Sequence, residues 1–323
     1  MGTERDDSCY NLAMTIALLI GALLVAFLLL GKAADMVVVH IRHIGERLGI
    51  GTVMLGLMLG LFTSLPEFAL GVNAVVNDAH GLSFGNLVGG MAVLLGLVLG
   101  VSAMLNRRMN TKTQKGHAPF LLAYLFLPLL LGLDGQLGIV DAVILLLVYP
   151  LLAYALYIGH RRAAGIQISF QPHRFAGTDF LLVLTGTIFI LLLSNGIVRI
   201  TLELLSVFNA PEFLAGFLVF AIGTNLPEIS VAVRSWKRHV SELSLSHLFG
   251  SAMVNPLLLG GFALIDPIRL NVGVPYITLA VLMGLLFIAV LAFCRSKDTL
   301  TRKEGILLVA GYVVVALSQA LLY

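Results

Sequence analysis

The sequence predicts an all-α polytopic membrane protein, with about ten transmembrane helices in two inverted five-helix repeats. Three observations lead to this prediction: a composition poor in charge, a series of long apolar runs, and an internal repeat. The chain is 59% hydrophobic and 11% charged, whereas soluble domains carry about 25% charged residues. So few polar groups could not cover a water-exposed surface, and lipid is therefore the expected partner of much of the chain.

Ten apolar runs are candidates for membrane-spanning helices, which need roughly 20 apolar residues each. The polar stretches between the runs are brief, so no soluble domain fits between them. The longest stretch divides the chain into a first five-helix repeat at 1–160, a cytoplasmic linker at 161–176 and a second repeat at 177–323. The expected helices cover residues 11–41, 48–76, 82–105, 118–133, 137–159, 177–207, 211–235, 242–264, 272–294 and 304–322.

The basic residues predict the orientation of the helices. All but four of the 20 Lys and Arg residues fall in loops that join an odd-numbered helix to the next even-numbered one. The exceptions are Arg5, Lys32, Arg199 and Arg269. Because Lys and Arg concentrate on the cytoplasmic side of membrane proteins, we expect both termini to lie outside the cytoplasm. The acidic N-terminus does not match a cleaved signal peptide, and a prokaryotic inner membrane suits these features.

An internal repeat relates the two halves of the chain. Residues 62–96 align without a gap on residues 223–257, and ten of the 35 positions are identical. Both segments contain Thr-x-Leu-Pro-Glu, which ends at Glu67 and at Glu228. With five helices in each half, the second copy enters the membrane from the opposite side, so the repeat is expected to be inverted. Inverted repeats with interrupted helices are typical of secondary transporters, whose substrates bind near the membrane midplane.

A proline stands in the middle of each repeated helix, one residue before the glutamate. Pro66 and Pro227 each remove a backbone donor and clash with a carbonyl one turn earlier, which should free carbonyls near 59–63 and 220–224. In lipid, such backbone is tolerated only where it lines a cavity or finds another partner. Further oxygen donors stand beside the prolines, at Thr63, Ser64, Thr224 and Asn225.

Glu67 and Glu228 would bring two carboxylates to the membrane midplane, which is costly unless a cation shares them. Calcium takes about six to eight oxygen ligands with flexible geometry, and this set of residues could supply most of them. The same oxygens could hold sodium once calcium has left. Competition between two cations for one set of ligands is a physical basis for exchange. The residues therefore favour a secondary antiporter with Ca²⁺ and Na⁺ as transported ions and without a cofactor.

The two segments resemble the alpha-repeats of the calcium/cation antiporter superfamily, typified by sodium/calcium exchangers. The family pattern is a GTSLPE-like motif on helices 2 and 7, followed by a GNxxGSNxxN/D-like motif on helices 3 and 8. The family has ten helices, with both termini outside. The resemblance covers essentially the whole chain and includes the Gly31–Asp35 stretch of the first helix. It implies alternating access in which helices 1 and 6 move against the rest.

The resemblance also implies roles for individual residues. Glu67 and Glu228 match the central calcium-binding carboxylates. Thr63 and Thr224 match threonines that bind the metal through backbone and side chain. The remaining matches are Ser64 and Asn225, at a serine pair linked to sodium sites, and Ser251 and Asn255, at the serine and the Asn/Asp of helix 8.

The third expected helix departs from the family pattern. It has Gly90, Met91 and Leu94 where the family has Ser, Asn, and Asn or Asp. At least one sodium site would therefore lack side-chain oxygens, which leaves the coupling stoichiometry open. Proton-coupled exchange of calcium or another divalent cation is the alternative, because a titratable His247 stands where the first repeat has Asn86. A packing role for this histidine is the competing interpretation.

Other classes of protein find less support in the sequence. Residues 81–85 read GLSFG and match GxSxG, but a nucleophile elbow needs a strand-turn-helix context. An intramembrane serine protease would instead need Ser83 inside the bundle and facing a histidine. A non-transporting membrane protein is a further alternative. The chain has no basic-aromatic motif typical of nucleic-acid binding, and the sequence does not set the oligomeric state.

Overall fold

The computed structural model describes residues 3–48, 60–106, 108–111, 115–164, 177–229, 245–296 and 299–323, and helices dominate these residues. The α-helices are α1 (Thr3–Arg47), α3 (Leu65–Val76), α4 (His80–Ala92), α5 (Leu99–Asn106), α6 (Ala118–Leu131), α7 (Ile139–Ala164), α8 (Gly177–Phe208), α9 (Glu212–Ala215), α10 (Ala221–Thr224), α12 (Leu245–Ile265), α13 (Val274–Ser296) and α14 (Arg302–Leu322). Two π-helical segments, η1 (Val93–Val98) and η3 (Gly216–Phe220), join α4 to α5 and α9 to α10.

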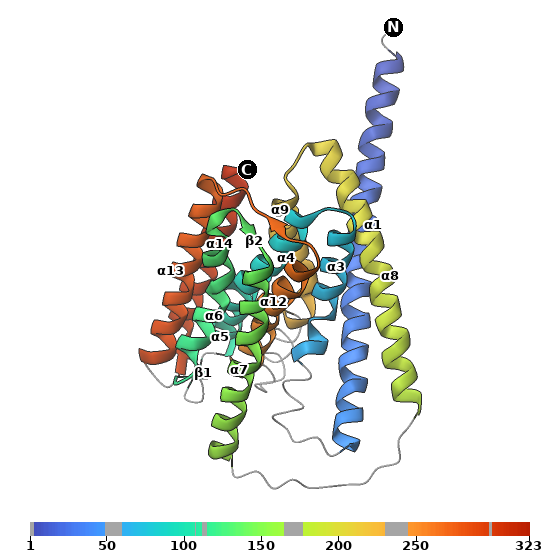
Figure 1. Ribbon diagram of the computed structural model, residues 1–323. Helices are drawn as coiled ribbons and strands as arrows, with labels where there is room; N and C mark the ends of the chain where they lie inside the picture. The colour runs from blue at the N-terminus through green and yellow to red at the C-terminus, as the bar shows by residue number, and fades with distance from the viewer. Residues whose placement is uncertain are drawn as a thin grey trace.

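The long helices run along one common direction (Figure 1). The helices α1 and α8 pack side by side at one edge of the bundle, and α13 and α14 pack together at the other (Figure 1). The two ends of the chain lie at the same, upper end of the view. This arrangement puts α3, α4, α10 and α12 in the interior, where polar residues must find partners within the protein.

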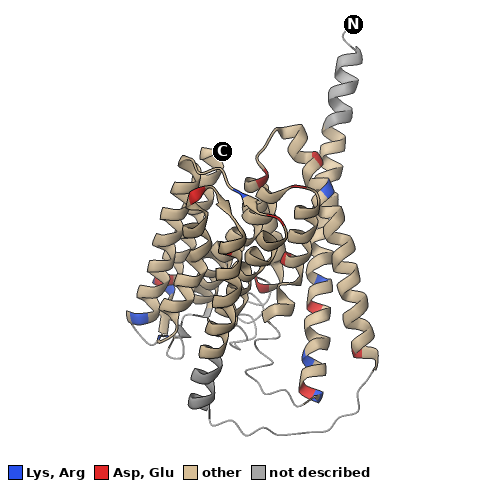
Figure 2. Ribbon diagram, viewed as in Figure 1, with Lys and Arg blue, Asp and Glu red and all other residues tan. Residues whose placement is uncertain are grey.

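Six helices among the described residues are long and apolar enough to cross a membrane. They are Ala13–Arg47, His80–Leu105, Gly177–Phe208, His247–Ile265, Val274–Ser296 and Arg302–Leu322. Shorter apolar helices accompany them at Leu65–Val76, Ala118–Asp134, Ile139–Ala155 and Glu212–Thr224. Between their ends, α13 and α14 carry no charged residue (Figure 2). A chain with such helices and such a composition is a helical membrane protein.

Two helices are longer than their apolar runs predicted. The first was expected at 11–41, but α1 spans Thr3–Arg47, because hydropathy marks only the part that lipid can cover. Its end is supported by an ion pair one turn apart, Arg42 to Glu46 at 3.0 Å. The helix α7 reaches Ala164, four residues into the predicted linker. Residues 165–176, 49–59 and 230–244 lie outside the described part of the chain.

Short strand pairs link the two halves of the chain at the two ends of the bundle. At one end β1 (Arg108–Asn110) pairs antiparallel with β4 (Thr299–Thr301), with Arg108 opposite Thr301. At the other end β2 (Gln136–Leu137) pairs antiparallel with β3 (Ile268–Arg269). Figure 1 shows β1 low and β2 high in the bundle.

The buried apolar side chains form two clusters. The smaller cluster joins α1, α3 and α8, with Leu30, Leu70 and Ile197 fully buried. The larger cluster joins α4, α6, α12, α13 and α14. Neighbouring residues of the seventh expected helix divide between them, Phe220 in the smaller cluster and Ala221 in the larger. The segment that leads to Glu228 therefore runs along the boundary between the two clusters.

Glycines let α4 approach this boundary segment very closely. A Cβ added at Gly85 or Gly89 would lie 2.3 or 2.7 Å from backbone oxygens of Phe213 or Phe217. A Cβ at Gly216 would lie 2.2 Å from the Leu82 oxygen. Small residues four apart are a common way for membrane helices to bring their backbones together. Here they set α4 directly against η3 and α10, beside the repeated motif.

Candidate functional site

The two Thr-x-Leu-Pro-Glu motifs share one local backbone geometry. Helix is interrupted at Ser64, with φ −89° and ψ 12°, and at Asn225, with φ −92° and ψ 11°. Each helix resumes at once, and Phe68 and Ile229 donate backbone hydrogen bonds to the oxygens of Ser64 and Asn225. The breaks therefore fall two residues before each proline, because the proline cannot donate to the preceding turn.

In each motif, side chains donate hydrogen bonds to one backbone carbonyl in the helical turn before the break. Thr63 Oγ1 and Ser64 Oγ donate to the Gly60 oxygen at 2.9 and 3.2 Å. Asn225 Nδ2 donates to the Ala221 oxygen at 2.8 Å. Both carbonyls lie in the ranges expected to be released from the helix. Both oxygens accept hydrogen bonds from the motif's own hydroxyl or amide groups, which take the place of the backbone donor lost at the break.

Both glutamates are buried. Glu67 is 4% exposed and Glu228 is 6% exposed. Thr224 of the second motif donates a side-chain hydrogen bond to the Glu67 carboxylate of the first. The two carboxylates interact electrostatically with each other, and Asp35 of α1 also acts on Glu228. The fold therefore brings together two acids that are far apart in the sequence.

Several buried polar atoms around these acids lack a hydrogen-bond partner among the described residues. They are Glu67 Oε2, Asn225 Oδ1 and Asn255 Nδ2. Leaving a buried polar atom without a hydrogen-bond partner destabilises a protein by about 1–3 kcal/mol. Such atoms are expected where a ligand or an ion binds and supplies the missing partner. Carboxylate and amide oxygens are hard ligands of the kind that Ca²⁺ and Na⁺ take.

The helix α12 supplies a polar wall beside the breaks, with Ser251 and Asn255 both buried. This wall lies against the turn before the first motif, where a Cβ at Gly60 would be in ordinary contact with Gly250, 3.7 Å from its carbonyl carbon, and 4.0 Å from the backbone nitrogen of Ser251. The facing wall around Gly90 on α4 and η1 has apolar side chains, although Asn86, one turn earlier on α4, is buried and polar. Met91 and Leu94 are fully buried there and belong to the larger hydrophobic cluster.

Gly90 makes room for a side chain from the other half of the chain. A Cβ at this position would lie 2.9 Å from Asn255 Nδ2 and 3.6 Å from Asn225 Nδ2. The space of a residue-90 side chain is thus taken by amides of the second half. Sequence reasoning recognised the missing oxygen at Gly90 but not that an asparagine fills its place.

A cavity of about 120 Å³ opens beside the breaks. Its lining includes Thr63 and Glu228 together with Asp35, Pro227 and His247. Sequence reasoning did not place Asp35 at the site, although the Gly31–Asp35 stretch that resembled the family's first helix contains it. His247 lines the same cavity as Glu228.

The GLSFG segment does not form a nucleophile elbow. It lies within the continuous helix α4. Ser83 is 1% exposed, and its Oγ has no hydrogen-bond partner among the described residues. A serine nucleophile needs a base within hydrogen-bond reach, so the described part of the chain gives the protease alternative no catalytic pair.

The sequence profile of the sodium/calcium exchanger protein family matches residues 18–158 and 178–321. The chain is 25% identical over 305 residues to an uncharacterized membrane protein of Methanocaldococcus jannaschii, covering 93% of this chain and 97% of that protein. It is 25% identical to the inner membrane protein YrbG of Escherichia coli, covering 94% and 95% of the two chains. It is 23% identical to the sodium/calcium exchanger MaX1 of Methanosarcina acetivorans, covering 90% and 95%.

Solved structures of the sodium-calcium exchanger NCX_Mj have the same fold. One soaked with Na⁺ and Sr²⁺ superimposes with a TM-score of 0.65 at 23% identity, covering 94% of this chain and 99% of the exchanger. Another, soaked without Na⁺ and Ca²⁺, superimposes with a TM-score of 0.62. The profile match spans both halves and most of the chain, and exchangers are transporters rather than enzymes. The chain therefore belongs to the sodium/calcium exchanger protein family, within the calcium/cation antiporter superfamily.

Proposed function

We propose that this protein is a secondary antiporter that exchanges Ca²⁺ for Na⁺ by alternating access at a midplane site containing Glu67 and Glu228. The observation that carries the proposal is the pair of buried, electrostatically coupled carboxylates at two equivalent helix breaks. Two such acids repel each other and are poorly solvated in the bilayer. A bound cation offsets both costs. The site without a cation is therefore unfavourable, which favours replacement of one cation by another over simple release.

The proposed calcium ligands are Glu67, Glu228, Thr63 and Thr224. The Thr224–Glu67 hydrogen bond supports a site in which both motifs contribute to one ion. We assign Ser64, Asn225, Ser251 and Asn255 to the wider cation-binding set. Asn225 supports this assignment, because its amide nitrogen donates to the Ala221 carbonyl while its amide oxygen has no hydrogen-bond partner among the described residues.

We further propose ten spans in two inverted repeats, 1–160 and 177–323, joined by the linker 161–176. The matching dihedral angles at Ser64 and Asn225 support a repeat. The strand pairs support its inversion, since a shift of 161 residues carries Arg108 of β1, at one end of the bundle, onto Arg269 of β3, at the other. The family profile leaves residues 159–177 unmatched, which supports a linker there.

The cavity that reaches Glu228 supports access from the cytoplasmic side in this conformation. It extends between Asp35 and Val38 of α1 and His247 at the start of α12. These positions lie toward the end of α1 that the basic residues assign to the cytoplasm. Alternating access would then close this path by movement of the packed pair α1 and α8 against the rest of the bundle.

The relatives support the proposed ions and location. The relative from Methanosarcina acetivorans carries the name sodium/calcium exchanger, and the relative from Escherichia coli the name inner membrane protein. We propose a prokaryotic inner membrane with both termini outside the cytoplasm. Both chain ends lie at the same end of the bundle (Figure 1), which supports an even number of spans.

The test is sodium-gradient-driven calcium uptake by the purified protein in liposomes. Glu67→Gln and Glu228→Gln should each lower uptake by about 100-fold or more, because removing one member of a buried charged group costs about 3–5 kcal/mol. The matched control is Glu203→Gln, the same change at an exposed residue of α8, which should transport normally. Full uptake by either site variant would refute the site.

Proton coupling is the second candidate, and two observations favour it. The wall at Gly90, Met91 and Leu94 offers no side-chain oxygen, and His247 lines the cavity. If protons replace sodium, a pH gradient alone should drive calcium uptake, and His247→Gln should weaken that uptake. Strict dependence on sodium, with no response to a pH gradient, would eliminate this candidate and leave sodium as the counter-ion.

A further inference from the structure

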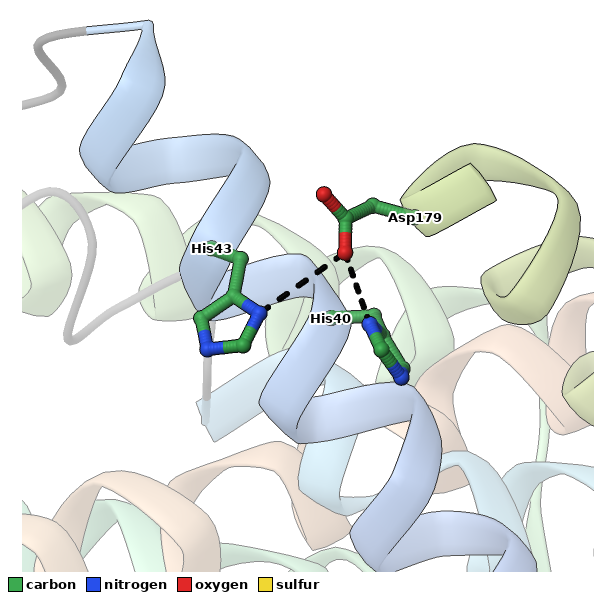
Figure 3. A group of neighbouring side chains, drawn as sticks. All are labelled: His40, His43 and Asp179. Carbon is green, nitrogen blue, oxygen red and sulfur yellow. Dashed lines mark hydrogen bonds and ion pairs between the residues drawn. The ribbon is translucent and has the colours of Figure 1, made fainter. Parts of the chain in front are cut away.

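Two histidines at the end of α1 converge on one carboxylate at the start of α8, away from the cation site. Figure 3 shows His40 and His43 of α1 with Asp179 of α8 between them. His40 Nδ1 lies 2.8 Å from Asp179 Oδ1, and His43 Nδ1 lies 3.7 Å from the same oxygen. These three ligand atoms all lie within 4.8 Å of one another. We propose that this cluster binds a divalent transition-metal ion of the Zn²⁺ class.

The shorter separation is that of a hydrogen bond and the longer is not, and both lie near the spacing of ligands around a tetrahedral metal. Zinc binds imidazole nitrogen and carboxylate oxygen at about 2.0–2.2 Å in tetrahedral geometry, which sets neighbouring ligands roughly 3.3 Å apart. The two observed separations, 2.8 and 3.7 Å, fall on either side of that value. His43 is too far from Oδ1 for a hydrogen bond, yet its Nδ1 faces the oxygen as a ligand would.

The sequence and the helix geometry explain why the two imidazoles meet. Residues three apart on a helix lie on one face, so His40 and His43 project together toward α8. The rings meet edge to face, with centroids 5.7 Å apart. Two imidazoles and one carboxylate are a ligand set for zinc and its neighbours in the transition series. Calcium, which takes oxygen ligands, is not favoured here.

Arg47 acts on the other oxygen of the same carboxylate. Its Nη1 lies 2.6 Å from Asp179 Oδ2, so it holds the carboxylate in place and leaves Oδ1 to face the histidines. Hydrogen bonds of this kind commonly orient metal ligands. The guanidinium also repels a dication, which weakens binding, but Arg47 is 30% exposed and solvent screens that repulsion.

Access and burial are also suitable. Asp179 is buried, while the His43 side chain is 48% exposed, so an ion can enter from the His43 side. The fourth tetrahedral position would hold water. A metal at this point would fasten the end of α1 to the start of α8, the two helices that pack side by side at the edge of the bundle. The proposal does not depend on the ions that the central site exchanges.

The experiment is a Zn²⁺ titration of the purified full-length protein, stripped of metal, against a chromophoric chelator at neutral pH. The wild type should bind one tight equivalent, and Zn²⁺ should raise its unfolding temperature. His43→Gln should weaken that equivalent by about tenfold or more, which is the lower range for losing even an outer partner of a metal ligand. Because His43 makes no hydrogen bond to Asp179, the variant should fold normally without metal.

The matched control is His80→Gln. It removes the imidazole of the other described cluster with metal-ligand geometry, Asp78, His80 and Asp266, and should keep the tight equivalent. Co²⁺ provides an independent readout, because tetrahedral Co²⁺ absorbs strongly in the visible range and octahedral Co²⁺ does not. The proposal is wrong if the wild type binds no tight equivalent, if His43→Gln keeps it, or if His80→Gln loses it.

Discussion

Ser64 and Asn225 occupy equivalent turns in the two broken helices, with nearly the same dihedral angles, but their surroundings differ. The helix that follows the second break in the sequence, α12, carries the buried polar side chains of Ser251 and Asn255 and packs against α3 of the first half. The corresponding segment of the first half, α4 with η1, carries Gly90 and Leu94 at the positions of Ser251 and Asn255, and its buried polar residue there is Asn86, one turn before Gly90. The backbone is thus close to symmetric where the side chains are not.

The difference shows that the polar side chains of the second half serve both halves. Thr224 donates to Glu67 across the repeat boundary. The first half lacks a side-chain oxygen at Gly90, and the amide of Asn255 from the second half occupies that space. The two walls can be changed separately, which allows this account of the asymmetry to be tested.

Adding charge to the polar wall should have the largest effect. Asn255→Asp would place a further carboxylate beside Gly90, and at an effective dielectric of about 20 a cation roughly 4 Å away gains about 4 kcal/mol. Desolvation offsets most of this gain. We expect the sodium concentration for half-maximal calcium efflux to fall about tenfold. The matched control Asn77→Asp, at the exposed end of α3, should leave it unchanged.

An unchanged sodium dependence in Asn255→Asp would mean that this wall does not face the counter-ion. The asymmetry between the two walls would then be a packing difference without a role in coupling. The same efflux assay, run with a pH gradient in place of sodium, would show whether the added carboxylate acts on protons instead.

Adding a side chain at Gly90 should have a smaller effect. Gly90→Ala adds a methyl group whose carbon would lie 2.9 Å from Asn255 Nδ2, so the amide must move. Overpacking of this kind costs about 1 kcal/mol at its lower limit, and we expect calcium uptake to fall about fivefold. Gly250→Ala is the control, because a Cβ there meets nothing within 4 Å. Equal uptake in the two variants would contradict the role given to Asn255.

The sequence was sufficient for the family and for the helical membrane fold, because long apolar runs and a spaced Thr-x-Leu-Pro-Glu motif are local patterns. It could not give the contacts between the halves. Nothing in the local sequence says that Thr224 reaches Glu67 or that Asn255 lies over Gly90, since both depend on how glycine-lined helices cross. Asp35 was missed as a site residue for the same reason, because its role depends on how α1 packs against Pro227.

The smallest expected effect concerns the support of the first break rather than its ligands. Asn73 lies on α3, six residues after Glu67, and donates to Ser194 Oγ of α8 at 2.7 Å. Asn195 of α8 donates to Asn73 Oδ1 at 2.9 Å. Hydrogen bonds between membrane helices contribute about 0.6 kcal/mol on average and less than about 2 kcal/mol at most. We therefore expect Asn73→Ala to lower the free energy of unfolding by about 1 kcal/mol.

This change should leave the calcium affinity of the site unaltered, because Asn73 lies outside the set of proposed ligands. Thermal unfolding in detergent and calcium binding, measured on the same preparation, separate the two quantities. Thr185→Ala is the matched control, since among the described residues that hydroxyl bonds to carbonyls of its own helix alone, and its loss should change neither quantity. A drop in calcium affinity in Asn73→Ala would mean that the position of α3 against α8 sets the geometry at Glu67. The first break would then depend on α8 for its shape as well as on Thr224 for a polar partner.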